Sequence, residues 1–88
     1  MPKIYEEVGL VFFFYSSDMD EPPHIHVEYK EGGVMKVWLR EEELETAWIR
    51  AGMPRHKQTE AYQIIENKRK TFLNNWYEFK KTGKINKK

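Results

Sequence analysis

The stretch that decides the fold is Glu21-Pro22-Pro23-His24-Ile25-His26-Val27-Glu28-Tyr29. Each proline ring locks φ and disfavours a helical conformation in the residue before it, so the chain enters this stretch extended. Polar and apolar residues then alternate, which predicts a β-strand over residues 24–30. On that strand His24, His26 and Glu28 share one face, opposite the apolar residues between them.

A second strand is predicted over residues 34–39, after a loop at 31–33 whose two glycines supply the positive φ values of a tight hairpin. The length of this loop sets the register of the two strands. The polar face then has three facing pairs, which are Glu28 with Lys36, His26 with Trp38, and His24 with Arg40. The first is a pair of opposite charges, which stabilises a sheet when it lies across two strands.

Residues 8–15 predict a further strand, which comes first in the chain. Its side chains alternate little in polarity, so it needs cover on both faces. One of two aromatic sets is expected beside the histidines, either Phe12 with Phe14 or Phe13 with Tyr15, and the residues leave both choices open. The aliphatic face of the hairpin is expected to meet the helices.

Two helices are predicted for the rest of the chain. Residues 41–51 begin with glutamates, which suit the positive end of a helix dipole. Apolar residues then recur at helical spacing, namely Leu44, Ala47, Trp48 and Ala51. A longer helix is predicted from about Lys57 to Lys81, with an apolar stripe along one side. On this interpretation Trp48, Phe72 and Trp76 belong to the core.

The predicted fold class is α+β, with one domain over residues 1–88 and a basic, frayed tail over 82–88. The sheet is a three-stranded antiparallel meander, or a four-stranded one with a short strand near Lys3–Glu6. The two helices follow it in the sequence and pack on one of its faces.

The composition excludes several classes of protein. The 88 residues include no cysteine, which rules out disulfides and thiolate metal sites. The N-terminus lacks the apolar core of a signal peptide, and the longest apolar run, Leu10 to Tyr15, is too short to span a bilayer. We therefore expect a cytoplasmic protein without membrane contacts. A net charge of +1 argues neither for nor against nucleic acid.

Three motifs are distinctive in combination: Asp-x-x-Glu-Pro-Pro-His-Ile-His-Val-Glu from Asp18, Lys-Val-Trp-Leu from Lys36, and Asn-Asn-Trp-x-Glu-Phe from Asn74. Together they resemble the small bacterial domain of unknown function 4160. The resemblance implies a compact domain often encoded beside another small protein, an arrangement that suggests a toxin–antitoxin pair. It marks signature positions without assigning roles to them, and these are Pro22, Pro23, His24, His26 and Trp76.

The polar face of the hairpin is the candidate site, because histidine readily changes its charge near neutral pH and is a common metal ligand. A divalent metal is one alternative, held by His24 and His26 with Glu28 or a loop acid. The loop offers three such acids, which are Asp18, Asp20 and Glu21. The other alternative is that the histidines brace the Pro-Pro loop and that the protein needs no cofactor.

RNA cleavage is a second interpretation of the same face. Without a metal, this reaction needs a general acid, a general base and a cation that holds the phosphate. The two histidines could supply the acid and the base, and Arg40 or Lys36 the cation. Trp38 or Tyr15 could stack an RNA base.

Partner binding is the interpretation that we favour, because it requires the least of the sequence. Aromatic faces with mixed charge are typical of protein interfaces. The binding residues expected on this face are Tyr15, Glu28, Lys36 and Trp38. The partner would be another protein or a second copy of the chain, in keeping with a toxin–antitoxin pair. Replacing both histidines with alanine is then expected to leave folding intact.

Overall fold

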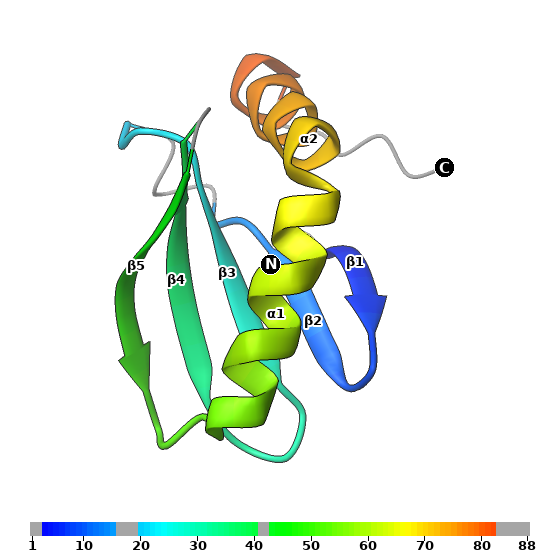
Figure 1. Ribbon diagram of the computed structural model, residues 1–88. Helices are drawn as coiled ribbons and strands as arrows, with labels where there is room; N and C mark the ends of the chain where they lie inside the picture. Colours follow the sequence, from blue (N-terminus) through cyan, green and yellow to red (C-terminus); the bar gives the residue numbers. More distant parts are fainter. Residues whose placement is uncertain (1–2, 16–19, 41–42, 83–88) are drawn as a thin grey trace.

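The computed structural model describes residues 3–15, 20–40 and 43–82, which form five strands followed by two helices (Figure 1). The strands are β1 (Lys3–Glu7), β2 (Leu10–Phe13), β3 (His24–Tyr29), β4 (Val34–Leu39) and β5 (Leu44–Arg50). The helices are α1 (Arg55–Asn67) and α2 (Arg69–Thr82). All neighbouring strands pair antiparallel in the order β1-β2-β3-β4-β5. The predicted α+β class and the meander are confirmed.

The sheet has five strands, so the prediction of three or four was too low. The short strand expected near Lys3–Glu6 is confirmed as β1. The helix predicted over residues 41–51 is wrong, because Leu44–Arg50 forms the edge strand β5. Asp18, Glu41, Glu42 and the tail over 83–88 lie outside the described residues.

A bulge in β5 explains the wrong helix. Thr46 lies opposite Val37 and Trp48 lies opposite Lys36, so Ala47 is an extra residue between them. A bulge shifts the alternation of a strand by one position. The spacing from Leu44 to Ala47 and Trp48 therefore imitates the repeat of a helix, although the chain is extended.

The β3–β4 hairpin has the predicted strands but a different register. The amide of Tyr29 donates to the carbonyl of Gly33 at 2.9 Å, so the loop is 30–32 instead of 31–33. The three predicted pairs are therefore wrong by two positions. The observed pairs on the polar face are His24 with Trp38, His26 with Lys36, and Glu28 with Val34. A shift of two keeps every side chain on its predicted face, because side chains alternate with a period of two.

The core lies between the sheet and the helices. The aliphatic face of the hairpin is buried there as predicted, and consists of Ile25, Val27, Met35, Val37 and Leu39. β2 and the residue after it add Phe12 and Phe14 to this core, and the ring of Phe12 lies 5.6 Å from that of Phe72. Phe13 and Tyr15 therefore point to the opposite face, which decides between the two aromatic sets.

The predicted long helix is two helices that meet at Lys68, whose φ of −111° and ψ of 17° depart from helical values. The apolar stripe was nevertheless correct, since its main members are buried: Ala61, Ile64, Ile65, Phe72, Trp76 and Phe79. None of the helices in the described part of the chain has the length and apolar character needed to cross a membrane.

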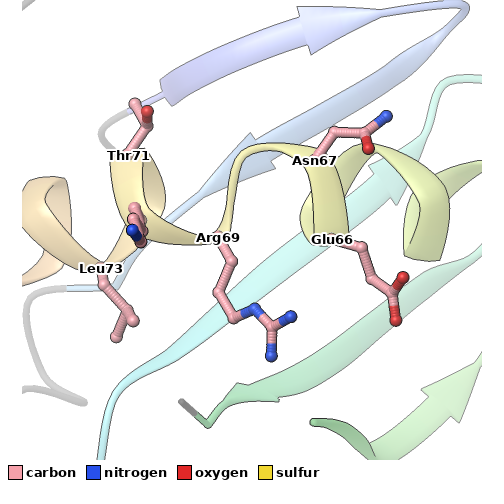
Figure 2. Close-up of a pocket in the computed structure, with 6 residues that line it drawn as sticks. Glu66, Asn67, Arg69, Thr71 and Leu73 are labelled. Atoms are coloured by element: carbon pink, nitrogen blue, oxygen red, sulfur yellow. The ribbon is translucent and has the colours of Figure 1, made fainter. Parts of the chain in front are cut away.

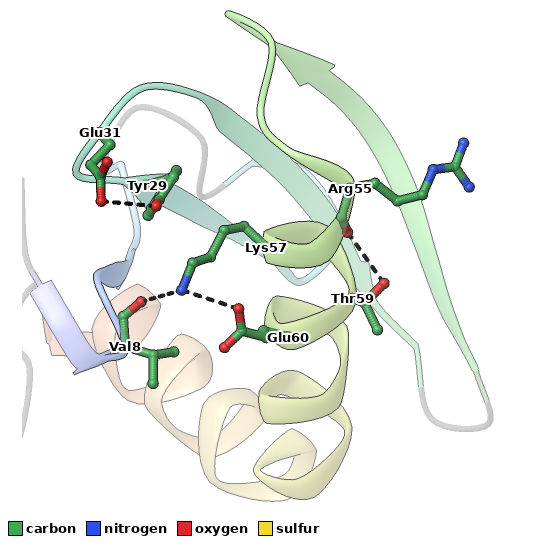
Figure 3. Close-up of polar contacts among 7 residues, drawn as sticks. All are labelled: Val8, Tyr29, Glu31, Arg55, Lys57, Thr59 and Glu60. Atoms are coloured by element: carbon green, nitrogen blue, oxygen red, sulfur yellow. Dashed lines mark hydrogen bonds and ion pairs between the residues drawn. The ribbon is translucent and has the colours of Figure 1, made fainter.

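Lys57 ties the start of α1 to the sheet (Figure 3). Its ammonium donates to the carbonyl of Val8 at 2.8 Å and pairs with Glu60 at 3.0 Å. The same ammonium lies 5.2 Å from the centre of the Tyr29 ring. These contacts hold α1 on one face of the sheet, and no helix of the described residues lies on the other face.

Candidate functional site

The sheet face opposite the helices carries a cluster of rings and cations that we call the aromatic face. Its members are Phe13, Tyr15, His24, His26, Lys36, Trp38, Trp48 and Arg50. The sheet register aligns these residues, because side chains that face each other in an antiparallel pair lie on the same side. One row crosses four strands, from β2 to β5, and consists of Phe13, His26, Lys36 and Trp48.

His26 is the centre of the aromatic face and is only 2% exposed. Its ring stacks on Phe13 with the centroids 5.4 Å apart and the planes 15° apart. Tyr15 meets it edge-on at 4.6 Å, and Trp48 packs on it at 5.7 Å. The imidazole therefore has the surroundings of a core aromatic residue, although no helix covers this side of the sheet.

His24 connects the aromatic face to the Pro-Pro segment. Its ring is fully buried and meets His26 edge-on at 5.2 Å and Trp38 edge-on at 5.6 Å. Its Nδ1 lies 2.9 Å from the carbonyl oxygen of Pro22. A carbonyl only accepts hydrogen bonds, so Nδ1 carries a proton and donates it to this contact. This geometry agrees with the alternative in which the histidine braces the Pro-Pro loop.

Lys36 brings a buried charge into the cluster, since only 8% of the residue is exposed. Its ammonium pairs with the carboxylate of Glu21 and lies 4.5 Å from the centre of the Trp38 ring. Glu21, one of the acids considered as a metal ligand, is thus the counter-ion of this lysine. Glu28 lies opposite Val34 and is exposed at the border of the face.

We predict that Glu21→Gln lowers the free energy of unfolding by about 2 kcal/mol, because it leaves a buried ammonium without its carboxylate. Lys36→Met should cost less than about 1 kcal/mol, because the charge is removed together with the need to compensate it. Urea unfolding of both variants measures these values. Equal stability of Glu21→Gln and the wild type would show that the ion pair contributes nothing.

Trp48 and Arg50 are the site residues that sequence reasoning missed. Trp48 was expected to lie on a helix and to pack into the protein core. It lies instead on β5, where its half-buried ring packs against His26. The guanidinium of Arg50 lies 4.3 Å from the centre of the Trp48 ring. Both residues would have been found if residues 44–50 had been interpreted as a bulged strand.

The geometry limits the chemistry that this face can perform. Both histidine rings are buried, so a substrate cannot touch them without a change in the aromatic layer above. Arg40 follows β4, is exposed, and donates to Glu45 at 3.0 Å. The third histidine, His56, is exposed on α1. Within residues 3–15, 20–40 and 43–82, no group of three histidine or acidic side chains is arranged to hold a metal ion.

Shifted pKa values occur at the rim of the sheet. Hydrogen bonds from Lys30 and Lys3 lower the pKa of the Glu6 carboxyl, and these contacts tie β1 to the β3–β4 loop. The pKa of Tyr29 is raised, first by its hydrogen bond to Glu31 and then by burial (Figure 3). Each shift is explained by an ordinary contact between surface side chains, so neither marks a catalytic group.

Comparison with known proteins places these features in a family. A family model described as "Domain of unknown function (DUF4160)" matches residues 9–77, which include the Pro-Pro segment, both buried histidines and Trp48. No curated protein matches the chain, and neither does any solved structure. The matched segment covers most of the chain, from the turn before β2 well into α2. The protein is therefore a member of the DUF4160 family.

Proposed function

We propose that this chain is a protein-interaction module that binds a partner protein on the aromatic face. In the bacterial cytoplasm it would be one component of a two-protein pair of the toxin–antitoxin kind. The observation that supports the proposal most is the pair of half-buried tryptophans, Trp38 and Trp48, each with a cation over its ring, on a sheet face without a helix.

The composition of the outer layer favours a protein partner. Tryptophan, tyrosine and arginine supply most of the energy at protein interfaces, and Tyr15 is 41% exposed beside them. The rings of Phe13 and His26 beneath this layer are packed and buried, so the outer side chains rest on a rigid base. A surface that is ordered before binding loses less conformational entropy when the partner docks.

The catalytic alternative receives less support. A general acid or base must come within hydrogen-bond distance of the group that it protonates or deprotonates. His24 and His26 lie below Trp38, Trp48 and Tyr15, so a substrate would first have to displace these rings. Docking on the outer layer requires no such opening.

The test is the affinity of this chain for the product of the gene next to its own, measured by calorimetric titration. Trp48→Ala is expected to weaken binding at least tenfold, because a central aromatic anchor is removed. Arg50→Ala should weaken binding about threefold to tenfold without affecting the fold, because its side chain is exposed.

Ile49→Ala is the matched control. Ile49 is the residue between the other two on β5, is 41% exposed, and lies opposite Met35 on the helical side. It should leave the affinity unchanged. A complex that Trp48→Ala and Ile49→Ala weaken equally would contradict docking on the aromatic face. Self-association of the wild type, lost in Trp48→Ala, would identify a second copy as the partner.

A further inference from the structure

Two adjoining cavities form a groove along α2. The first has a volume of about 560 Å³ and lies at the junction of the helices, where Glu66, Arg69, Lys70 and Leu73 line it. The second has a volume of about 320 Å³ and lies between α2 and the Pro-Pro segment. Leu73 lines both cavities, so they adjoin at this side chain, and we call the pair the groove.

Three residues of α2 form one wall of the groove at intervals of four, and these are Arg69, Leu73 and Tyr77. Residues four apart lie one above another on the same side of a helix. With a rise of about 1.5 Å per residue, Arg69 and Tyr77 are about 12 Å apart along the helix axis. The groove therefore has two separate ends, each with its own chemistry.

The end at the helix junction is basic. Arg69 and Lys70 line it, and the guanidinium of Arg69 donates to the backbone carbonyl of Arg40 at 3.3 Å, which connects this end to the segment after β4. Glu66 is the acid beside them, and Figure 2 shows its side chain extending to the same side of the junction as that of Arg69. Two cations, Arg69 and Lys70, against the one carboxylate of Glu66 give this end an excess of positive charge.

The other end is aromatic and apolar. Pro22, Pro23 and Trp38 line it on the sheet side, and Tyr77 lines it on the helix side. Arg40 also lines this end, where its guanidinium pairs with the carboxylate of Glu45. Tyr77 is 56% exposed and meets the buried Trp76 edge-on at 5.2 Å, so its ring is supported from below. An exposed ring held in this way is a stacking platform for a flat partner.

We propose that this groove binds short single-stranded nucleic acid, with phosphates at Arg69 and Lys70 and a base stacked on Tyr77. The two ends of the groove together favour this ligand. An acidic peptide satisfies the cations, and an apolar peptide satisfies the rings, but every nucleotide carries both an anion and an aromatic ring. This activity goes beyond the proposed protein docking, and it uses Tyr77, Arg69 and Glu66, which lie outside the aromatic face.

The test is fluorescence anisotropy with a fluorescein-labelled octauridylate. Tyr77→Ala is expected to weaken binding fivefold or more, because it removes the stacking platform. Arg69→Ala should weaken binding and lower the slope of log affinity against log salt by about 0.7, the value for one lost phosphate contact on a single strand. Glu66→Gln should tighten binding about threefold, because it removes a repelling charge.

The Glu66→Gln variant is the most discriminating one, because a gain in affinity cannot result from misfolding. Arg50→Ala is the matched charge control, since it removes one exposed cation from the aromatic face and should leave this affinity unchanged. It also separates the two proposals, because protein docking can fail while binding of octauridylate persists.

Three results would overturn the proposal. The first is an affinity for octauridylate that Tyr77→Ala and Glu66→Gln leave unchanged. The second is competition by octaglutamate as effective as that by unlabelled octauridylate, which would make the site a charge-only surface for acidic peptides. The third is a loss of affinity in Arg50→Ala as large as that in Arg69→Ala, which would move the nucleic acid to the aromatic face.

Discussion

Gly33→Ala is expected to lower the free energy of unfolding by about 4 kcal/mol, one of the largest effects of a single methyl group in this chain. A Cβ at this position would lie 2.5 Å from the Cα of Met53, 2.6 Å from its Cβ and 2.9 Å from its nitrogen. Two of these atoms belong to the backbone, which cannot rotate away. The φ of Gly33 is +119°, which adds strain for any residue with a side chain.

Gly32→Ala is the matched control, because Gly32 has a φ of +125° and nothing within 4 Å of the Cβ position. It should cost about 2 kcal/mol from backbone strain alone. Urea unfolding gives the difference between the two variants, which isolates the clash with Met53. If both variants were destabilised equally, Gly33 would not lie as close to Met53 as it does in the structure.

The double variant His24→Ala, His26→Ala is expected to lose about 4 kcal/mol of stability. Replacing buried rings with alanine leaves cavities, and four neighbouring rings, including Phe13 and Trp48, lose their contacts with the two imidazoles. The sequence led us to expect that this double variant would fold normally. Because both imidazoles are buried, we now expect it to be destabilised. Thermal or urea unfolding, followed by tryptophan fluorescence, measures the loss.

His56→Ala provides the control for this second prediction. His56 is the third histidine of the chain and is exposed in the first turn of α1. Its replacement should change stability by less than about 0.5 kcal/mol, as is usual for surface positions. If the double variant were as stable as His56→Ala, the two buried rings would not be structural, and a chemical role for them would gain weight.

The parts of the fold that were predictable have a strong local pattern. The alternation over residues 24–30 and 34–39 predicted both strands of the hairpin and their buried faces. The register was two residues off, because the sequence Lys30 to Gly33 allows a three-residue loop at either of two positions. Only the hydrogen bond from Tyr29 to Gly33 decides between them.

The wrong predictions share a physical cause, which is that long-range pairing overrides local spacing. Ala47 and Trp48 fit a helix by spacing, but pairing with β4 makes this segment an extended strand. No proline or glycine in the sequence marks the break between the helices at Lys68. We attribute this break to the packing of α1 and α2 on the sheet. The candidate face was predicted from its histidines. Trp48 and Arg50 were missed because β5 had been predicted as a helix.

The burial of His24 and His26 was also beyond the sequence. An alternating strand predicts which side chains share a face, but it does not say whether that face is covered. Here Tyr15, Trp38 and Trp48 come from three different segments and close over the two imidazoles. The signature histidines thus support the outer aromatic layer from beneath, and the tryptophans above them are partly exposed.

The most direct test of docking on the aromatic face uses the three tryptophans as internal probes. Trp38 and Trp48 lie in the outer layer of that face. Trp76 lies on α2, is only 1% exposed and belongs to the core. The ¹⁵N-labelled chain is titrated with the product of the adjacent gene, and its three indole N–H signals are followed by NMR. If the partner docks on the aromatic face, the Trp38 and Trp48 signals will shift or broaden while that of Trp76 stays in place. A complex that forms and leaves both outer signals unchanged would contradict this docking.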